Sequence, residues 1–392
     1  MVKFIDLFSG IGGFRLALEE LGCNCVFSSE IDEYARQTYF KNFGSEPFGD
    51  IKEISEESIP EHNLLVAGFP CPGFSIAGVS KNNSLGRNHG LDHKQGDLFF
   101  EILRVLKHSR PNAFLLENVD NLRTYKKGKV WEIMEKELIG LGYSVSTEII
   151  DANLVVPQHR KRIFIVGLRD TSEFAFPEIE KKEIRLRDIL ENEVDDKFTL
   201  GDATWVYLQQ HKALHDAKGN GFGYSFADPD TSTTRTLTAR YWKDGSEILI
   251  EQKGKNPRKL TPRECARLMG FPDDFEIPVS NTQAYKQFGN AVVPEITKRI
   301  LESILQIIGK APLTRTPYTP STSISKVGGS MYTNYQGYGE WDFRNENTKQ
   351  FTHCFHIYPA MMIPQVARGL IELYGKEGRC LVRPILWKWD QS

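Results

Sequence analysis

The chain lacks long apolar runs, a secretion signal and any excess of charge. No run of about 18 apolar residues occurs in it, so we expect no membrane-spanning helix. Its first residues (MVKFID) have neither the apolar stretch nor the small-residue cleavage site of a signal peptide, which predicts a cytoplasmic protein. The 49 Lys and Arg residues nearly balance the 51 Asp and Glu residues. The net charge of −2 therefore gives no support for nucleic-acid binding, although a basic face can coexist with an acidic remainder.

The chain is also poor in cysteine, with 6 in 392 residues. The cysteines form no CxxC pair and have no histidines at zinc-ligand spacing, so we predict no metal site. Cys23 and Cys25 stand at the predicted start of a strand, where small buried thiols are common, and a reducing cytosol disfavours disulfides. Cys71 differs from the others because a proline flanks it on each side.

Strand-like and helix-like segments alternate through the first 167 residues, which predicts an α/β sheet with helices on both faces. Apolar residues at helical spacing predict helices near residues 14–21, 98–106 and 296–308. Strands are expected at residues 4–8, 26–29, 64–67, 113–116, 145–150 and 163–167.

Changes of composition divide the chain into five segments. Residues 1–171 are the first part of the main domain, and residues 257–310 return to it. Residues 172–256 are charged and rich in Gly, Asn and Thr, with strand-like pieces at 235–239 and 247–251, and we interpret them as a smaller lobe. A Thr-, Ser-, Pro- and Gly-rich linker (311–350) and a C-terminal segment (351–392) follow.

A glycine-rich turn follows the first predicted strand. The glycines of residues 6–13 (DLFSGIGG) let the chain turn tightly and bring backbone N–H groups against a ligand. Glu30 ends the next strand 20 residues after Gly10, a spacing that suits a carboxylate accepting hydrogen bonds from ribose hydroxyls. Asp50 follows a glycine at the next predicted strand end, where it would bind an adenine amino group.

The glycine pattern departs from G-x-G-x-x-G, and alone it also fits a purely structural turn. A pyrophosphate prefers a helix N-terminus without an acid nearby, whereas Asp6 stands immediately before this turn. An acid in that place suits a cationic sulfonium or amino group. The charges therefore favour S-adenosylmethionine over NAD, and no paired hydride-transfer residues accompany the glycines.

The cysteine between two prolines lies in residues 68–75 (GFPCPGFS), directly after a predicted strand. A lone cysteine is more often a buried small hydrophobe. Here the prolines remove backbone N–H groups and fix φ, which argues against a buried regular element. Because α/β folds place reactive groups in loops at the carboxyl ends of strands, we interpret Cys71 as a nucleophile.

Two further groups adjoin strands of the same predicted sheet. Glu117 ends the strand at 113–116, and residues 158–162 (QHRKR) precede the strand at 163–167. Singly, they fit a helix cap or surface acid and a solvated basic turn. Together with Cys71, they fit thiolate attack on carbon 6 of cytosine, which activates carbon 5 toward methylation. A protonated Glu117 would donate to N3, and Arg162 with Arg160 would hold the O2 side of a base flipped out of its duplex.

These motifs resemble, in their order along the chain, those of the bacterial 5-methylcytosine DNA methyltransferases. The matching blocks are residues 6–13, 29–32, 49–51, 68–75, 97–100, 117–119, 158–162, 263–271 and 287–294. The resemblance implies a Rossmann-like S-adenosylmethionine-dependent sheet with a smaller target-recognition lobe. It also implies a monomer that acts on double-stranded DNA beside a separate cognate restriction endonuclease, with an orphan methylase as the alternative. It implies catalytic roles for Cys71, Glu117, Arg160 and Arg162. It implies cofactor contacts for Phe8, Ser9, Gly10, Gly12, Gly13, Glu30, Ile31, Asp50, Ile51, Pro70, Leu98, Asn290 and Val292.

The smaller lobe carries a further resemblance. Residues 234–241 (TRTLTARY) and 243–246 (KDGS) are similar to members that read palindromes of the CCGG, CCNGG or CCWGG kind. Arg235, Arg240 and Lys243 are candidates for phosphate or guanine contacts, with ordinary exposed charges as the alternative.

Three features depart from the family's pattern or leave alternatives. Pro72 stands where many members have Gln, which predicts a stiffer loop, and residues 76–96 are expected to close over the flipped base. Residues 353–383 resemble the opening of an amino-methyltransferase without its catalytic motif, so we expect a catalytically silent tail. An RNA cytosine-5 methyltransferase of the same fold and a non-catalytic DNA-binding regulator are the alternative interpretations.

Overall fold

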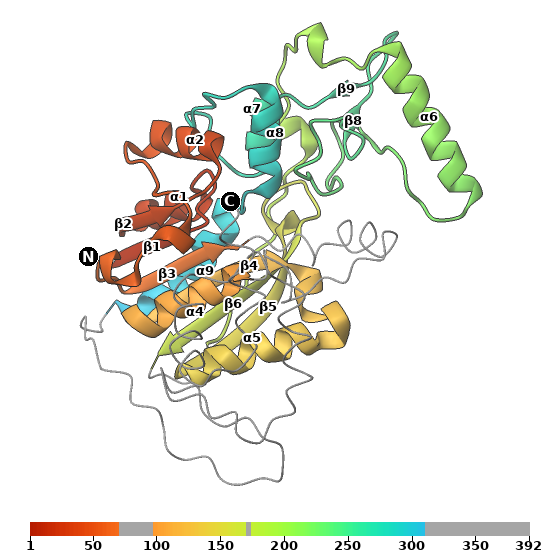
Figure 1. Cartoon of the computed structure of the whole chain (residues 1–392). Coiled ribbons are helices and arrows are strands. Elements are labelled where there is room, and N and C mark those ends of the chain that lie inside the picture. Colours follow the sequence, from red (N-terminus) through yellow and green to blue (C-terminus); the bar gives the residue numbers. More distant parts are fainter. Residues whose placement is uncertain (70–96, 170–173, 310–392) are drawn as a thin grey trace, which may run out of the picture. The chain divides into compact units, whose positions relative to one another are not determined.

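The computed structural model describes residues 1–69, 97–169 and 174–309, and a mixed six-stranded β-sheet forms their centre (Figure 1). The strand order is β2-β1-β3-β4-β6-β5. The first four strands are parallel, and β6 is antiparallel to both of its neighbours. The strands are β1 (Lys3–Leu7), β2 (Asn24–Ser29), β3 (Leu64–Gly68), β4 (Ala113–Val119), β5 (Tyr143–Asp151) and β6 (Lys161–Arg169). Each lies where the sequence predicts a strand, and the predicted α/β fold is confirmed.

Helices cover both faces of the sheet because successive strand residues point to opposite sides. In β1, Phe4 belongs to one buried core and Ile5 to the other. The first core is completed by α1 (Gly13–Glu20) and α9 (Pro294–Ile308), which pack against each other. The second core is completed by α4 (Asp97–Ser109) and α5 (Lys129–Gly140), and Figure 1 shows this pair on one face of the sheet.

The chain returns to the main domain through three helices, α7 (Pro262–Leu268), α8 (Asn281–Asn290) and α9. Thr261 and Glu264 form a capping box at the start of α7, with Pro262 at its first position. In α9, apolar residues at helical spacing are buried, as the periodicity predicts. The buried face of α9 therefore joins the first core, and the predicted bounds of the returning part stay a prediction.

Shorter elements connect these parts. Helix α2 (Glu33–Phe43) follows β2, begins at an Asp32 cap and ends at Gly44 in the left-handed conformation. The remaining turns are 3-10 helices: η1 (Ile51–Glu53), η2 (Glu56–Ser58), η3 (Asp120–Arg123), η4 (Tyr125–Gly128), η5 (Ala152–Leu154), η6 (Leu186–Asp188) and η7 (Asp196–Phe198).

The smaller lobe contains α6 (Asp202–Ala217) and a three-stranded sheet of β7 (Phe226–Ala227), β8 (Leu249–Ile250) and β9 (Arg258–Lys259). The strand predicted at 235–239 is wrong: these residues form no ladder with any described part of the chain, and an isolated bridge between Thr234 and Gln158 precedes them. The strand predicted at 247–251 is reduced to β8. The lobe's predicted boundaries stay a prediction.

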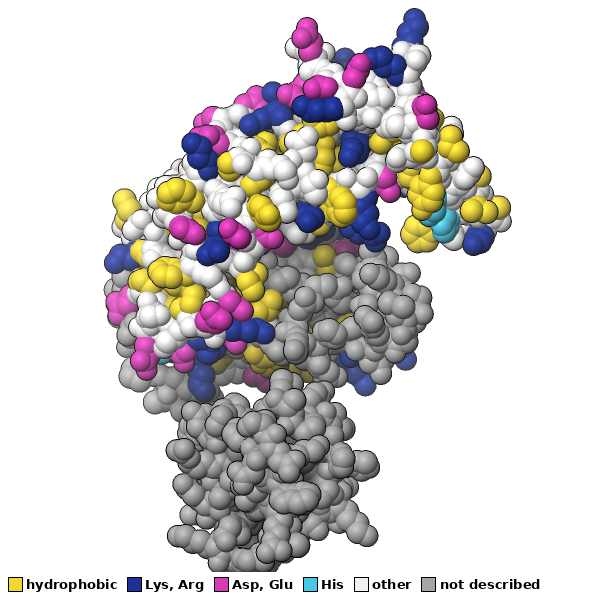
Figure 2. All heavy atoms as spheres, turned by 45° about the horizontal axis from the view of Figure 1, so that its top comes forward, with side chains coloured by type: hydrophobic (Ala, Val, Ile, Leu, Met, Phe, Trp, Pro, Cys, Tyr) yellow, Lys and Arg dark blue, Asp and Glu magenta, His cyan; other side chains and the backbone are white. Residues whose placement is uncertain are grey.

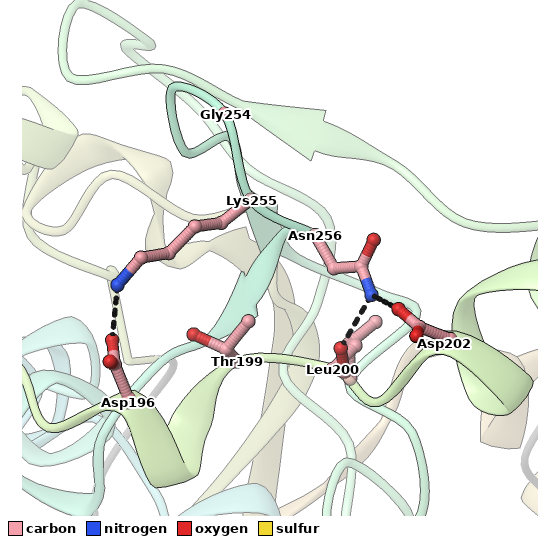
Figure 3. A pocket seen from close by; sticks show the side chains of 7 residues that line it. All are labelled: Asp196, Thr199, Leu200, Asp202, Gly254, Lys255 and Asn256. Atoms are coloured by element: carbon pink, nitrogen blue, oxygen red, sulfur yellow. Dashed lines mark hydrogen bonds and ion pairs between the residues drawn. The ribbon is translucent and has the colours of Figure 1, made fainter.

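A hollow in the lobe lies between η7, the start of α6 and residues 254–256 (Figure 3). Its polar side chains satisfy one another. Lys255 pairs with Asp196 at 2.7 Å, and the Asn256 amide donates to the Leu200 carbonyl at 2.9 Å and to Asp202 at 2.7 Å. We therefore interpret the hollow as a polar joint that holds the lobe's segments together.

Among residues 1–69, 97–169 and 174–309, no helix has the length and apolar character to span a bilayer. The nucleophile loop, including Pro70, Cys71 and residues 76–96, lies outside the described residues, and so does the tail 311–392. The predictions made for them stay predictions.

Candidate active site

The carboxyl ends of β1, β3 and β4 lie side by side at one edge of the sheet. The register pairs Leu7 with Ala67 and Gly68 with Glu117, so the segments that leave these strands start together. Phe69, two residues before Cys71, is buried, and its carbonyl accepts a hydrogen bond from the Asn118 side chain at 3.1 Å. The start of the loop that carries Cys71 is therefore fixed beside Glu117.

Glu117 and Arg162 form a largely buried ion pair at this edge. Arg162 Nε lies 2.9 Å from Glu117 Oε1, and the side chains are 17% and 10% exposed. The antiparallel register pairs Arg162 with Val119, which brings the arginine across from the end of β4. Burial raises the pKa of Glu117, opposed by the charges of Arg162 and Arg160. Burial thus favours the protonated carboxyl that donation to a ring nitrogen requires.

Arg160 is held by main-chain carbonyls. It is 2% exposed, and its terminal nitrogens donate to the carbonyls of Leu237 at 3.1 Å, Gly289 at 3.1 Å and Ala291 at 2.7 Å. Burial lowers the pKa of Arg160, Arg162 lowers it further, and Glu117 opposes both. The three carbonyls stabilise the charged form. The structure gives this side chain different partners from the base oxygen expected from the sequence, and contact with the base stays a prediction.

The glycine-rich turn adopts the backbone that its sequence predicts. Phe8, Gly10 and Gly12 have φ of 55°, 54° and 87°, in the left-handed region that favours glycine. The N–H of Gly10 donates to Glu30 Oε2 at 2.8 Å, and the N–H of Asp32 donates to Oε1 at 2.8 Å. Glu30 therefore faces the turn, as the spacing predicts.

The Glu30 carboxylate keeps acceptor capacity beyond these two N–H groups, because each carboxylate oxygen has two lone-pair sites. Burial raises the pKa of Glu30, and the N–H donors of Asp32 and Gly10 lower it. A Cβ placed on Gly10 would meet no atom within 4 Å, so open space lies beside the turn. These features fit a ligand whose hydroxyls reach Glu30.

The part of the chain that follows the lobe, residues 257–309 (the return segment), packs against the glycine-rich turn. A Cβ placed on Gly13 would lie only 2.7 Å from Val292 Cγ2, so the valine side chain packs directly on the glycine. Ser9 is buried next to them, and its N–H donates to the Ser29 carbonyl at 3.0 Å. Asn290 is exposed at the end of α8. The structure thus brings Gly13 and Val292 together from opposite ends of the described chain.

The remaining residues predicted to contact the cofactor lie after β2, at η1 and in α4. Ile31 is 71% exposed, whereas Ile51 is buried. Asp50 caps η1 by accepting from the Lys52 N–H at 3.0 Å. Leu98, in the first turn of α4, is partly buried. Their contact with the cofactor stays a prediction.

Sequence reasoning gave no role to two residues of this region, Phe48 and Asn118. Phe48 is 58% exposed and stacks on Phe27 with ring centroids 5.0 Å apart, and its carbonyl accepts from the Glu30 N–H at 2.8 Å. Its signal was an aromatic residue two positions before Asp50. Asn118 donates a hydrogen bond to the Phe69 carbonyl, and its position directly after Glu117 was the signal in the sequence.

Asp6 is the acid that the sequence placed before the turn. It is fully buried at the end of β1, and neither carboxylate oxygen has a hydrogen-bond partner among the described residues. Burial raises the pKa of Asp6, and Arg15 opposes the shift. Its predicted preference for a cationic ligand stays a prediction.

The predicted DNA contacts Arg235, Arg240 and Lys243 are all exposed in the lobe. Arg235 donates to the Gly223 carbonyl at 2.8 Å, and the Lys243 ammonium lies 5.7 Å from the Trp242 ring centre. Among the described residues, no cluster of His, Cys, Asp and Glu could hold a metal ion.

Comparison with known proteins places these features in a family context. The model of the C-5 cytosine-specific DNA methylases matches residues 2–306. The chain is 49% identical over 312 residues to the Type II methyltransferase M.DsaV of Dactylococcopsis salina, covering 78% of this chain and 87% of that protein. It is 49% identical over 316 residues to M1.ScrFI of Lactococcus lactis subsp. cremoris, covering 79% of each. The crystal structure of the S. pombe Dnmt2 methyltransferase superposes with a TM-score of 0.64 at 22% sequence identity. The superposition covers 79% of this chain and 99% of that one, so the two proteins share a fold.

Proposed function

Because the chain belongs to the C-5 cytosine-specific DNA methylase family, we propose how its own residues carry out that reaction. The enzyme transfers a methyl group from S-adenosylmethionine to carbon 5 of cytosine in DNA. The observation that carries the assignment of residues is the Glu117–Arg162 pair, 2.9 Å apart, beside the anchored start of the Cys71 loop.

In the proposed mechanism, the Cys71 thiolate forms a bond to carbon 6 of a cytosine that has left the helix. A proton passes from Glu117 to N3, and Arg162 holds the O2 side, so the ring becomes an electron-rich enamine. S-adenosylmethionine, when bound, supplies an electrophilic methyl group. Carbon 5 takes that methyl group, which leaves S-adenosylhomocysteine. A solvent water then takes the carbon 5 proton, the electron pair of that bond re-forms the double bond between carbons 5 and 6 and expels the thiolate, and the N3 proton returns to Glu117.

The cofactor is proposed to lie along the glycine-rich turn. Glu30 would accept from the ribose hydroxyls, and Asp50 would accept from the adenine amino group. Support comes from the Glu30 carboxylate, which faces the turn through the Gly10 N–H. The other proposed contacts are Phe8, Ser9, Gly12, Gly13, Ile31, Ile51, Pro70, Leu98, Asn290 and Val292.

The DNA substrate is proposed to be a double-stranded palindrome of the CCGG, CCNGG or CCWGG kind. Arg235, Arg240 and Lys243 would reach phosphates or guanine edges. Their exposure supports this, and Figure 2 shows basic side chains beside the hollowed part of the described surface near the lobe. Because the relatives are Type II methyltransferases, we propose that this chain protects DNA from a separate restriction endonuclease, as a cytoplasmic monomer.

Covalent trapping tests the assignment of the nucleophile. A duplex that contains 5-fluorocytosine blocks loss of the group at carbon 5, so the thiolate adduct should accumulate and survive a denaturing gel. Wild type and Cys25→Ser, a change at a cysteine that contacts Tyr39, should both form the adduct. Cys71→Ser should form none, and an adduct with this variant would refute the proposed chemistry. Bisulfite sequencing of DNA from a host expressing the chain identifies the target sequence.

A further inference from the structure

Three segments that are distant in sequence meet directly before β6. They are residues 157–160, the loop 234–239 of the lobe, and the end of α8 with its following residues, 287–292. The first two run side by side as an isolated parallel bridge: the Thr234 N–H donates to the Pro157 carbonyl at 2.9 Å, and the His159 N–H donates to the Thr234 carbonyl at 2.9 Å. Backbone hydrogen bonds thus attach the lobe loop to the residues directly before β6.

Side chains strengthen this attachment. Gln158 is fully buried; its Oε1 accepts from the Leu237 N–H at 2.8 Å, and its Nε2 donates to the Leu268 carbonyl at 3.1 Å. The Thr236 hydroxyl donates to the His159 carbonyl. The same few residues therefore bind the loop 234–239 and the return segment.

The loop also packs directly on the return segment. A Cβ on Gly289 would collide with the backbone of Thr238 and Ala239, so only glycine permits this approach. Three residues later, Val292 packs against Gly13 of the glycine-rich turn. Close packing therefore connects the loop with the wall of the proposed cofactor site.

Arg160 joins all three segments. Its guanidinium donates to Leu237 in the lobe loop and to Gly289 and Ala291 in the return segment. Two residues further along the chain, Arg162 pairs with Glu117. No other described side chain donates hydrogen bonds to both the loop 234–239 and residues 289–291 while standing beside the Glu117–Arg162 pair.

We propose that Arg160 is a positioning residue that makes DNA binding by the loop 234–239 and cofactor binding at the glycine-rich turn depend on each other. The proposal rests on the proposed function, since it takes the loop as DNA-contacting and the turn as cofactor-binding. A ligand that orders the loop fixes the Leu237 carbonyl and, through the guanidinium, the carbonyls of Gly289 and Ala291. Cofactor binding then requires less ordering of the return segment, and by linkage the effect is the same in both directions.

Arginine suits this role because its planar fork can donate to several carbonyls in fixed directions. A lysine keeps the charge but concentrates its donors at one nitrogen, and glutamine removes the charge and most donors. The coupling between DNA binding and cofactor binding should therefore be strongest in the wild type, weaker in Arg160→Lys and weakest in Arg160→Gln.

The experiment measures the Kd of S-adenosylhomocysteine for the full-length protein, with and without a duplex that carries the mapped target sequence. In wild type the duplex should tighten cofactor binding by about 10-fold. In Arg160→Gln this ratio should fall to about 2-fold or less, with Arg160→Lys between them. An unchanged ratio in Arg160→Gln, or no coupling in wild type, would overturn the proposal.

Arg169→Gln is the matched control. Arg169 is a buried arginine at the other end of the same strand, and it also donates to a carbonyl, that of Arg110. A merely structural role for Arg160 predicts that both variants lose thermal stability and keep the coupling ratio. The positioning role predicts that only Arg160→Gln loses the ratio.

A milder variant keeps the test decisive if Arg160→Gln does not fold. Thr236→Val removes the hydroxyl that bonds the His159 carbonyl and leaves the buried arginine in place. It should lower the coupling ratio partially, and an unchanged ratio would contradict the proposal. Because coupling is read from binding alone, it stays separate from the trapping assay, in which failure of wild type to form an adduct would reject the proposed nucleophile.

Discussion

The contact between Gly13 and Val292 gives a quantitative test of how the cofactor turn is built. In Gly13→Ala, the added Cβ would lie 2.7 Å from Val292 Cγ2 and 3.1 Å from the Val292 carbonyl oxygen. Overpacking of this kind costs about 1–3 kcal/mol of unfolding free energy. Replacing glycine in a helix gains at most about 1 kcal/mol, and Gly13 begins α1, so the clash should dominate. We expect a net loss of about 1–2 kcal/mol.

A double-mutant cycle separates the clash from other effects. Val292→Ala alone removes two methyl groups from a buried site and should cost about 1–2 kcal/mol. In the double variant the new methyl at position 13 occupies part of the space vacated at 292. The unfolding free energy lost in the double variant should therefore be smaller than the sum of the two single-variant losses, by about 1 kcal/mol or more.

The assay is equilibrium denaturation of the four proteins, with cofactor affinity measured in parallel. Gly10→Ala serves as the control, because a Cβ there meets no atom within 4 Å and the cost comes from its positive φ alone. The unfolding free energy lost in Gly10→Ala should be the same whether residue 292 is valine or alanine. Strict additivity of Gly13→Ala and Val292→Ala would show that the return segment does not pack on the turn.

Four further outcomes are expected. Because burial raises the pKa of Glu117, its protonated form persists to higher pH, so the wild-type methylation rate should fall as pH rises through that pKa; Glu117→Gln should lower the rate by about 10²-fold or more and remove this limb from the pH–rate profile. Glu30→Gln should raise the KM for S-adenosylmethionine by about 10-fold with a smaller change in kcat, as measured by initial rates, since one charged acceptor is lost. Arg258→Met should cost about 3–5 kcal/mol in denaturation experiments, because it leaves the fully buried Glu264 without the guanidinium 2.7 Å away. Deleting residues 311–392 should leave methylation intact, and loss of activity in a folded truncated protein would contradict the silent-tail prediction.

The parts of the fold that depend on local pattern could be predicted from the sequence. The central strands β3 (LLVAG) and β4 (AFLLENV) are short, mostly apolar runs, and the glycines at positions 10 and 12 predict a turn because glycine adopts positive φ easily. Glu117 and Arg162 were predicted to act together because both adjoin strands at one edge of a sheet. The structure places the two side chains 2.9 Å apart, and their catalytic roles stay a prediction.

The parts that depend on distant partners could not be predicted in the same way. The segment 235–239 has strand-like residues, but its main-chain groups bond to Gln158 and Arg160, almost 80 residues earlier, so no ladder forms. For the same reason the sequence showed Arg160 as a basic residue beside Arg162 and gave no sign of its three carbonyl partners. Helix α6 has Leu208 as its only buried residue, and so weak an apolar face gives little periodicity to detect.

The packing of α9 on α1 has a consequence for synthesis on the ribosome. The face of the sheet that carries Phe4, Val66 and Leu115 is covered in part by Ile300 and Ile304 of the return segment. In a nascent chain that has emerged only as far as β6, α1 is present but the part of the face that α9 covers stays uncovered until more than 130 further residues follow. At bacterial elongation rates this interval lasts on the order of 10 s. We therefore expect chaperones to bind the emerging polypeptide during this interval, and methylation competence to arise only after α9 has been synthesised.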